Sequence, residues 1–281
     1  MINIKSRFPA RFWNNFVRGM MAFFVINVLL IVFTVMANSF GNNWFEGFLP
    51  SGFTLKWYSQ AWSEFQLGHV LLVTSEVVIA VVLFSVVLGV PAAYVMARKN
   101  FPGKSALMFL FLLPMMIPPV TYGIPMATVM YKYAVGGTLL GVIMANMVPA
   151  LPFIILVMTP FIEQIDENLE NAAKVFGAGT LKTFWHVLVP LLGPGILASS
   201  LLVLVRTISM FELTFMTAGP DNQTLVVALF TSMNAAGVRP QQLTDAMAMI
   251  YMVITLIWLL VALQFVNPTQ LVSRVKEVPQ D

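Results

Sequence analysis

Cysteine, histidine and charged residues are all scarce in this 281-residue chain. It has no cysteine, which excludes disulfides, thiolate metal sites and cysteine nucleophiles. Its two histidines, His69 and His186, cannot supply the roughly four convergent ligands of a typical metal site. No GxxxxGK[ST] phosphate-binding loop, HExxH or GxSxG motif occurs. These absences disfavour an intramembrane enzyme and place any nucleotide site outside this sequence.

Long apolar blocks dominate what is present. Hydrophobic residues make up 59% of the chain and charged residues only 10%, where a soluble domain carries roughly 25% charged residues. A helix needs about 20 mostly apolar residues to cross a bilayer. The sequence therefore predicts an all-α, polytopic membrane protein, with residues 1–281 forming a single membrane domain. Six spans are predicted at residues 19–40, 70–97, 106–130, 138–161, 187–210 and 246–266.

Basic residues predict the orientation of these spans. The first apolar block is longer than the roughly 7 to 15 residues of a signal peptide, so we expect an uncleaved span. The segments placed inside are Lys- and Arg-rich, which predicts that residues 1–18, 162–186 and 267–281 are cytoplasmic. Inside lie Lys5, Arg7, Arg11, Arg18, Arg98, Lys99, Lys104, Lys174, Lys182, Arg274 and Lys276; outside lie Lys56, Lys132 and Arg239.

Proline is concentrated in the third and fourth blocks. It removes a backbone donor, and freed backbone groups at membrane depth persist where protein or a water-lined cavity satisfies them. The cluster indicates an internal path, although proline is also generally commoner in membrane helices than in soluble ones. The prolines are Pro114, Pro118, Pro119, Pro125, Pro149, Pro152 and Pro160.

Several polar side chains lie within or beside these kinked spans. Ionisable groups in a membrane are costly, so each is a candidate for lining a solute path; mutual pairing or snorkelling to the interface is the alternative. The candidates are Thr121, Tyr122, Asn146, Arg206, Ser209 and Glu212, and two further acids, Glu76 and Asp245, lie in similar positions.

The segment that follows the fourth block predicts a short amphipathic helix. Apolar residues recur every three or four positions, at Ile162, Ile165, Leu169, Ala172, Ala173 and Phe176. Acids occupy the first turns, where the helix dipole favours them, and Gly177 ends the helix. Small alanines would let another surface approach closely. Both a docking helix and a surface connector without a partner fit this pattern.

The same segment resembles a known signature. Asn171-Ala172-Ala173, then Gly177 and Val187-x-Val189-Pro190, is similar to E-A-A-x3-G-x9-I-x-L-P in the membrane-spanning subunits of type I ABC importers. The stretches GFTLKWY, LLPMMIPPVTYGIP and TAGPDNQTLVVALF resemble the spermidine/putrescine-like branch. One departure is Asn171 in place of the leading Glu, with Glu170 one position earlier.

A second departure concerns the solute. Polyamine-type relatives often carry an acidic pair shortly before the Gly-Pro turn that Gly219 and Pro220 match. This chain has Ser209 and Met210 there, and its nearest acid is Glu212. A polyamine is therefore weakly supported, and a phosphonate, a sugar or polyol, or an opine-like molecule fits equally well.

The resemblance implies a function as well as a fold. It implies a permease subunit in the bacterial inner membrane, with no cofactor of its own, because ATP and Mg bind to a partner ATPase. Implied partners are cytoplasmic ATP-binding subunits, a second, related permease subunit, a solute-binding protein and the lipid bilayer. Residues implied to dock on the ATPase are Glu170, Asn171, Ala172, Ala173, Phe176 and Gly177.

Other functions are less consistent with the sequence. An autonomous secondary transporter or channel would use the few membrane charges, but no internal repeat is evident and such a carrier needs no docking helix. The net charge of +3 does not indicate nucleic acid, because the basic residues sit mostly at the ends of apolar blocks and form no basic patch with interleaved aromatics.

Overall fold

Helices make up the regular structure of this chain. The computed structural model describes residues 10–42, 50, 52–234 and 240–264, and within these ranges the only β pairing is a bridge between Gly41 and Phe53. The predicted cytoplasmic tail at 267–281, the basic residues Lys5 and Arg7, and Arg239 lie outside the described residues. The chain divides into two compact units, residues 1–64 with 232–250 and residues 65–231 with 251–281.

The first unit contains α1 (Ala10–Ser39), α2 (Lys56–Glu64) and the beginning of α12 (Gln241–Gln264). The first predicted span corresponds to α1, which begins at Ala10 rather than near residue 19. Its apolar side chains are exposed within this unit, as expected of a helix that faces lipid. The sixth predicted span corresponds to α12, and both helices are long and apolar enough to cross a membrane.

Polar contacts join α2 to the end of α1 and to Gly41 just after it. The buried Trp57 indole donates to the Gly41 carbonyl at 2.7 Å, and the Tyr58 hydroxyl lies 2.7 Å from Ser39 Oγ. Burial raises the pKa of the Tyr58 phenol, although the hydrogen bond with Ser39 opposes that rise. Trp57 in the GFTLKWY stretch is therefore part of the packing of α2.

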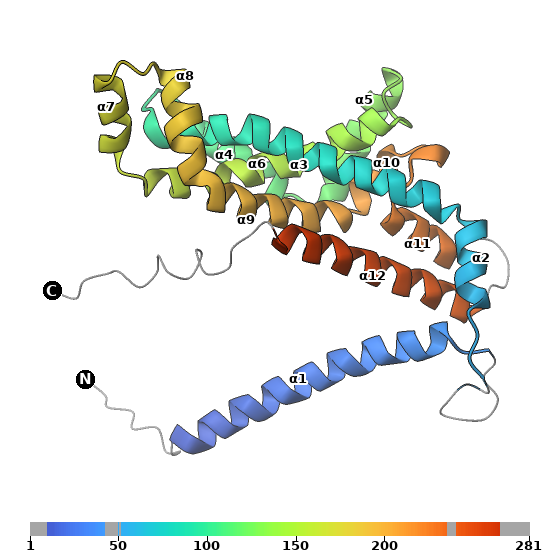
Figure 1. The fold of residues 1–281 in the computed structure, drawn as a ribbon. Helices are drawn as coiled ribbons and strands as arrows, with labels where there is room; N and C mark the ends of the chain where they lie inside the picture. Colours follow the sequence, from blue (N-terminus) through green and yellow to red (C-terminus); the bar gives the residue numbers. More distant parts are fainter. Residues whose placement is uncertain (1–9, 43–49, 51, 235–239, 265–281) are drawn as a thin grey trace. The chain divides into compact units, whose positions relative to one another are not determined.

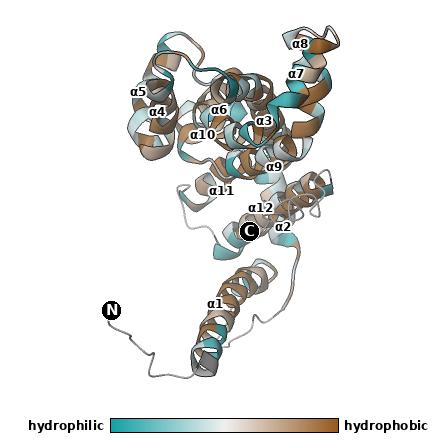
Figure 2. Ribbon diagram, turned by 90° about the vertical axis from the view of Figure 1, so that its left-hand side faces the viewer, coloured by the Kyte–Doolittle hydropathy of each residue, from teal (hydrophilic) through white to brown (hydrophobic). Residues whose placement is uncertain are grey.

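The core of the second unit consists of α3 (Leu67–Arg98), α6 (Leu139–Glu163) and α9 (Val189–Ile208), with α3 packed along the other two (Figure 1). Hydrophobic residues predominate along these long helices (Figure 2). Gly89 permits the close approach of α3 to α6, because a Cβ atom there would lie 2.7 Å from Ile154 Cγ2. The second, fourth and fifth predicted spans correspond to these helices.

The third predicted span, residues 106–130, is broken in the structure. It forms α4 (Lys104–Met116) and α5 (Pro119–Lys132), which are bent by 98° at the break. Pro119 cannot donate a backbone hydrogen bond, and the residue before it, Pro118, has an extended ψ of 134°. The described residues therefore contain five helices suited to cross a membrane, or six if the bent pair is one span.

One end of the second unit carries α7 (Glu167–Val175) and α8 (Thr180–Thr183) (Figure 1). A short π-helix, Phe184–Leu188, joins α8 to α9, so that the helical stretch runs from Thr180 to Ile208. The fifth span thus begins earlier than the predicted residue 187.

At the opposite end of the unit, the loop at residues 133–138, between α5 and α6, packs against the loop at residues 218–224, between α10 and α11. The amide of Gly137 donates to the Thr217 carbonyl at 2.9 Å, and Asn222 Nδ2 donates to the Gly137 carbonyl at 2.9 Å. A Cβ atom on Gly219 would lie 2.5 Å from the Gly137 oxygen, so glycine is required by the close approach. Two short helices that the sequence did not predict, α10 (Glu212–Thr217) and α11 (Leu225–Asn234), flank this region.

Candidate functional site

The α7 helix is bounded by local signals in the sequence. At its start, Asp166 Oδ1 accepts a hydrogen bond from the Asn168 amide at 2.9 Å, which caps the helix. At its end, Gly177 adopts a φ of +82°, a conformation that glycine tolerates without strain. A helix is therefore present where the sequence predicted one, but it begins at Glu167; Ile162 belongs to α6, and Ile165 to the turn between the two helices.

One side of α7 and the turn after it present apolar side chains to the exterior. Phe176 is 91% exposed and Val175 is 86% exposed, and Leu169 and Ala172 are exposed as well. Ala173 is half-buried. Large apolar side chains exposed together are typical of an interaction surface. Asn171 and Gly177, the other predicted docking residues, are also exposed.

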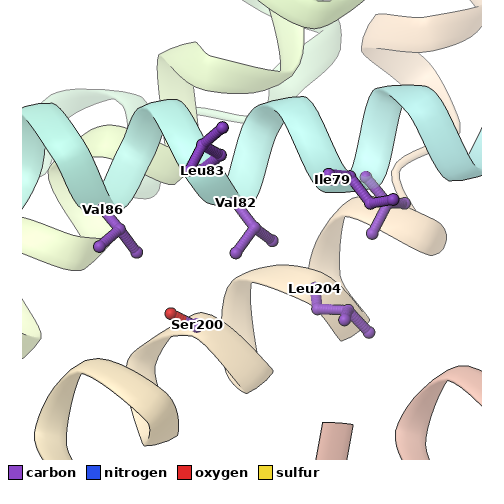
Figure 3. A pocket seen from close by; sticks show the side chains of 7 residues that line it. Ile79, Val82, Leu83, Val86, Ser200 and Leu204 are labelled. Carbon is purple, nitrogen blue, oxygen red and sulfur yellow. The ribbon is translucent and has the colours of Figure 1, made fainter. Parts of the chain in front are cut away.

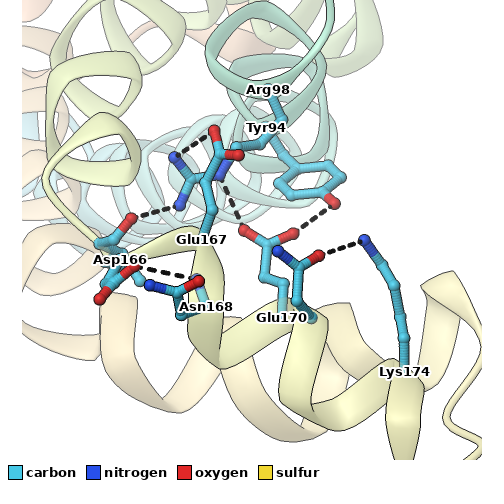
Figure 4. Close-up of polar contacts among 9 residues, drawn as sticks. Tyr94, Arg98, Asp166, Glu167, Asn168, Glu170 and Lys174 are labelled. Carbon is cyan, nitrogen blue, oxygen red and sulfur yellow. Dashed lines mark hydrogen bonds and ion pairs between the residues drawn. The ribbon is translucent and has the colours of Figure 1, made fainter.

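Glu170 faces the opposite way. It is 4% exposed, and its Oε1 accepts a hydrogen bond from Arg98 Nε at 2.7 Å while its Oε2 accepts one from the Tyr94 hydroxyl at 2.9 Å (Figure 4). Arg98 Nη2 also donates to the Ile165 carbonyl at 2.6 Å. Glu170 was predicted as a docking residue, but both of its carboxylate oxygens are engaged inside the chain. It is therefore not part of the outward surface of α7.

A small cavity of about 200 Å³ lies beside this network, between the end of α3 and α7. Lys174 Nζ, on one wall, lies 3.4 Å from Asn171 Oδ1. The described part of the chain contains no cluster of three His, Cys, Asp or Glu side chains suited to a metal ion. The cavity is lined by Tyr94, Arg98, Lys99, Glu167, Glu170, Asn171 and Lys174.

Two of the predicted path residues lie where α5, α6 and α10 meet. Asn146 is 2% exposed; its Nδ2 donates to Thr214 Oγ1 at 3.0 Å, and its Oδ1 has no hydrogen-bond partner in the described structure. The Tyr122 hydroxyl is likewise buried without a partner there. An unpaired buried polar atom costs free energy, so Asn146 Oδ1 and the Tyr122 hydroxyl are candidate contacts for a solute or a water molecule.

Arg206 and Glu212 lie within electrostatic range of the Tyr122 hydroxyl. The Arg206 guanidinium carbon is 5.7 Å from the centre of the Phe153 ring, a cation–π contact. Among the described residues, both ion pairs shorter than 4.0 Å involve Arg98, so Arg206 has no carboxylate partner in this part of the chain. Arg206 therefore carries a positive charge in the last turn of α9, with no acid at ion-pair distance among the described residues.

The remaining polar candidates have other environments. Ser209 Oγ donates to the Val205 carbonyl at 2.8 Å on its own helix, and Thr121 is exposed. Glu76 is exposed on α3. In the first unit, Asp245 accepts hydrogen bonds from Asn38 and Gln241, so it is satisfied by structural partners.

Three residues that matter in these two sites were not predicted from the sequence. Thr214, the partner of Asn146, follows Glu212 in the same short helix, which was not predicted. Tyr94 and Arg98 are four residues apart at the end of a span, and this spacing places them on one helix face. That spacing, at the predicted cytoplasmic end of a span, was the available signal.

An apolar groove of about 340 Å³ runs between α3 and α9 (Figure 3). Ser200 is the one polar residue that lines it, so the groove does not suit a polar solute. Its other lining residues are Val78, Ile79, Val82, Leu83, Val86 and Leu204.

Comparison with protein families gives a match over most of the second unit. Residues 85–275 match the family described as binding-protein-dependent transport system inner membrane component. The molybdenum transport system permease protein ModB of Haemophilus influenzae is 30% identical over 204 residues, covering 66% of this chain and 88% of that protein. A putative ABC transporter permease protein of Streptomyces antibioticus is 32% identical over 191 residues, covering 68% and 83%.

A sugar transport protein is similar over a shorter stretch. The diacetylchitobiose uptake system permease protein NgcG of Streptomyces coelicolor is 27% identical over 150 residues, covering 53% of this chain and 50% of that one.

The fold is also similar to solved structures. One is a bacterial ABC transporter involved in the import of the acidic polysaccharide alginate, with a TM-score of 0.74, 19% identity, and coverage of 92% of this chain and 99% of that chain. Another is a bacterial alginate ABC transporter in complex with a periplasmic protein that binds an alginate pentasaccharide. Its TM-score is 0.67 at 13% identity, with coverage of 96% of both chains.

Proposed function

Since this chain belongs to the family of binding-protein-dependent transport system inner membrane components, we propose that it forms half of the solute pathway of an ATP-driven importer and couples through α7 to a separate ATPase subunit. The observation that carries this proposal is the outward surface of α7, where Val175 and Phe176 are almost fully exposed. A groove on a partner would remove these side chains from water.

The proposed assembly follows from this role. ATP and Mg bind to the ATPase subunits, a second permease subunit completes the pathway, and a solute-binding protein delivers the solute. The chain acts as a single domain in the bacterial inner membrane. The distribution of lysine and arginine supports an orientation with both termini and α7 on the cytoplasmic side. Family membership favours this reading over an autonomous secondary transporter or channel.

The solute is proposed to be a small polar molecule with an anionic group, such as a phosphonate. Arg206 lacks a carboxylate partner in the described residues, and a positive charge at low dielectric repels a polyamine and attracts an oxyanion. The relatives reported above have names that refer to molybdenum, diacetylchitobiose and alginate. They do not support the spermidine/putrescine branch. Neutral sugars remain the second candidate class because of the diacetylchitobiose relative.

Reconstitution with matched glycine variants tests the role of α7. Gly177 and Gly103 both have positive φ, at +82° and +85°, and at neither position would an added methyl group meet another atom within 4 Å. Alanine therefore introduces a similar backbone strain of about 1 to 2 kcal/mol at each. We expect Gly177→Ala, and more strongly Gly177→Pro or Ala173→Glu, to reduce solute-stimulated ATP hydrolysis in proteoliposomes, while Gly103→Ala leaves it close to wild type.

Equal effects of Gly177→Ala and Gly103→Ala would show that α7 has no special role in coupling. Insertion of each variant is checked by its yield in the membrane fraction, so that loss of the protein is separated from loss of coupling.

A further inference from the structure

Polar contacts of a single buried side chain connect the α7 helix to α3. Within the helix, Glu170 is the one buried residue. Its apolar neighbours Leu169 and Val175 are exposed, so they contribute little apolar burial that would hold the helix in place. The contacts of the Glu170 carboxylate therefore have a large part in setting the position of α7.

Arg98 contacts α7 and the turn before it at three separate points. Its Nε binds Glu170 Oε1 at 2.7 Å, its Nη2 donates to the Ile165 carbonyl at 2.6 Å, and its Nη1 lies 3.7 Å from Glu167 Oε1 (Figure 4). The two short contacts, to Glu170 and to the Ile165 carbonyl, hold the helix and the turn before it, and the 3.7 Å approach to the exposed Glu167 adds little. The planar guanidinium presents its donors in a fixed fork, whereas a lysine ammonium is a compact charge on a flexible stem.

Tyr94 completes the network from the preceding turn of α3. Its hydroxyl donates to Glu170 Oε2 at 2.9 Å, so both carboxylate oxygens are held by the same helix face. Its ring lies 5.5 Å, edge to face, from Phe184 in the π-helix that precedes α9. The network thus links α7 to α3 and to the π-helix that leads into α9.

We propose that Tyr94 and Arg98 form a clamp on Glu170, and that this clamp transmits a displacement of α7 to α3 during transport. Both are positioning residues, because they act through α7 and not on the solute. This inference rests on the proposed function, in which an ATPase displaces α7. The inference gives the buried Arg98–Glu170 ion pair a role, which the outward surface of α7 does not provide.

The clamp also bears on the departure at Asn171. Successive residues on a helix are about 100° apart, so Glu170 and Asn171 cannot face the same way. Glu170 points inward onto Arg98, and Asn171 is exposed, where its Oδ1 lies 3.4 Å from Lys174 Nζ. Glu170 therefore does not replace the leading Glu of the signature at a partner surface.

Removing one member of a buried ion pair leaves an uncompensated charge, whereas replacing both members with apolar residues does not. Arg98→Met and Glu170→Gln are therefore the single variants, and Arg98→Met with Glu170→Met is the neutral pair. Tyr94→Phe removes one hydroxyl and little else, which keeps the test available if Arg98→Met is poorly folded. Lys99→Met is the matched control, because Lys99 lines the same cavity with the same charge but makes no ion pair in the described structure.

The first measurement concerns the full-length chain alone, in detergent. The chain has no cysteine, so Lys99→Cys with Lys174→Cys provides one reporter pair across the cavity between α3 and α7. We expect Arg98→Met, Glu170→Gln and Tyr94→Phe to slow disulfide formation by about fivefold or more, the scale of coupling within one shared network. The neutral pair should recover part of the rate. Unchanged cross-linking in all three single variants would overturn the clamp.

The second measurement is transport per ATP hydrolysed by the complete importer in proteoliposomes. We expect a drop in Arg98→Met and Tyr94→Phe, an intermediate value in the neutral pair, and the wild-type value in Lys99→Met. A wild-type ratio in both single variants would also overturn the clamp. Failure of the proposed function has a different result, because the wild-type complex itself would then show no solute-stimulated ATP hydrolysis.

Discussion

Gly89→Ala tests the packing of α3 on α6 most sharply. A Cβ atom at this position would lie 2.7 Å from Ile154 Cγ2, closer than real contacts allow, and 3.0 Å from Ile154 Cβ. Ile154 is fully buried, so its side chain has little room to move away. Overpacking of this kind costs about 1 to 3 kcal/mol. The gain in helix propensity from glycine to alanine offsets at most about 1 kcal/mol.

The matched control is Gly193→Ala in α9, where no atom lies within 4 Å of the added methyl group. Both variants gain the same helix propensity, so we expect Gly89→Ala to lower the free energy of unfolding by about 1 to 3 kcal/mol relative to Gly193→Ala. Unfolding by SDS titration in detergent micelles, followed by circular dichroism, measures this difference. Equal stability of the two variants would refute the close contact between α3 and α6.

Two further predictions concern the loops opposite α7 and the solute path. Gly219→Ala would place a methyl group 2.5 Å from the Gly137 oxygen, so we expect it to destabilise the protein by about 1 to 3 kcal/mol. The control in the same SDS titration is Gly179→Ala, whose methyl group meets no neighbour within 4 Å. Similar unfolding midpoints for the two variants would contradict the close packing of the two loops. Arg206→Gln should reduce the uptake of an anionic solute by about tenfold or more, which is the scale of a charge-assisted hydrogen bond. Arg206→Lys keeps the charge and should retain part of the activity. If uptake of a radiolabelled anionic solute is unaffected by Arg206→Gln, Arg206 is not part of the path.

The long helices were predictable because each has a long apolar run. The helices α3, α6 and α12 begin and end within a few residues of the predicted spans. The break between α4 and α5 was not predicted, because proline also occurs inside unbroken helices, as Pro149 does in α6. The short α10 and α11 fall below the length at which an apolar run indicates a span.

The α7 segment shows a different limit of sequence reasoning. Its period predicted a helix, and Gly177 predicted where the helix stops, but the predicted face began at Ile162, whereas α7 begins at Glu167. The pattern could not show that the buried residue is Glu170 while Leu169 is exposed. That outcome depends on Arg98, which lies in another helix and far away in the sequence. The fold brings the two residues together, and local periodicity carries no information about such a contact.

Photo-cross-linking from Phe176 tests the central claim most directly. A photoreactive amino acid replaces Phe176, the most exposed apolar side chain at the end of α7, in the assembled importer. The same substitution at Tyr133, which is 69% exposed near the loops opposite α7, is the control. We predict a cross-link to the ATPase subunit from position 176 and none from position 133. A cross-link to the ATPase from position 133 but not from position 176 would contradict docking through α7.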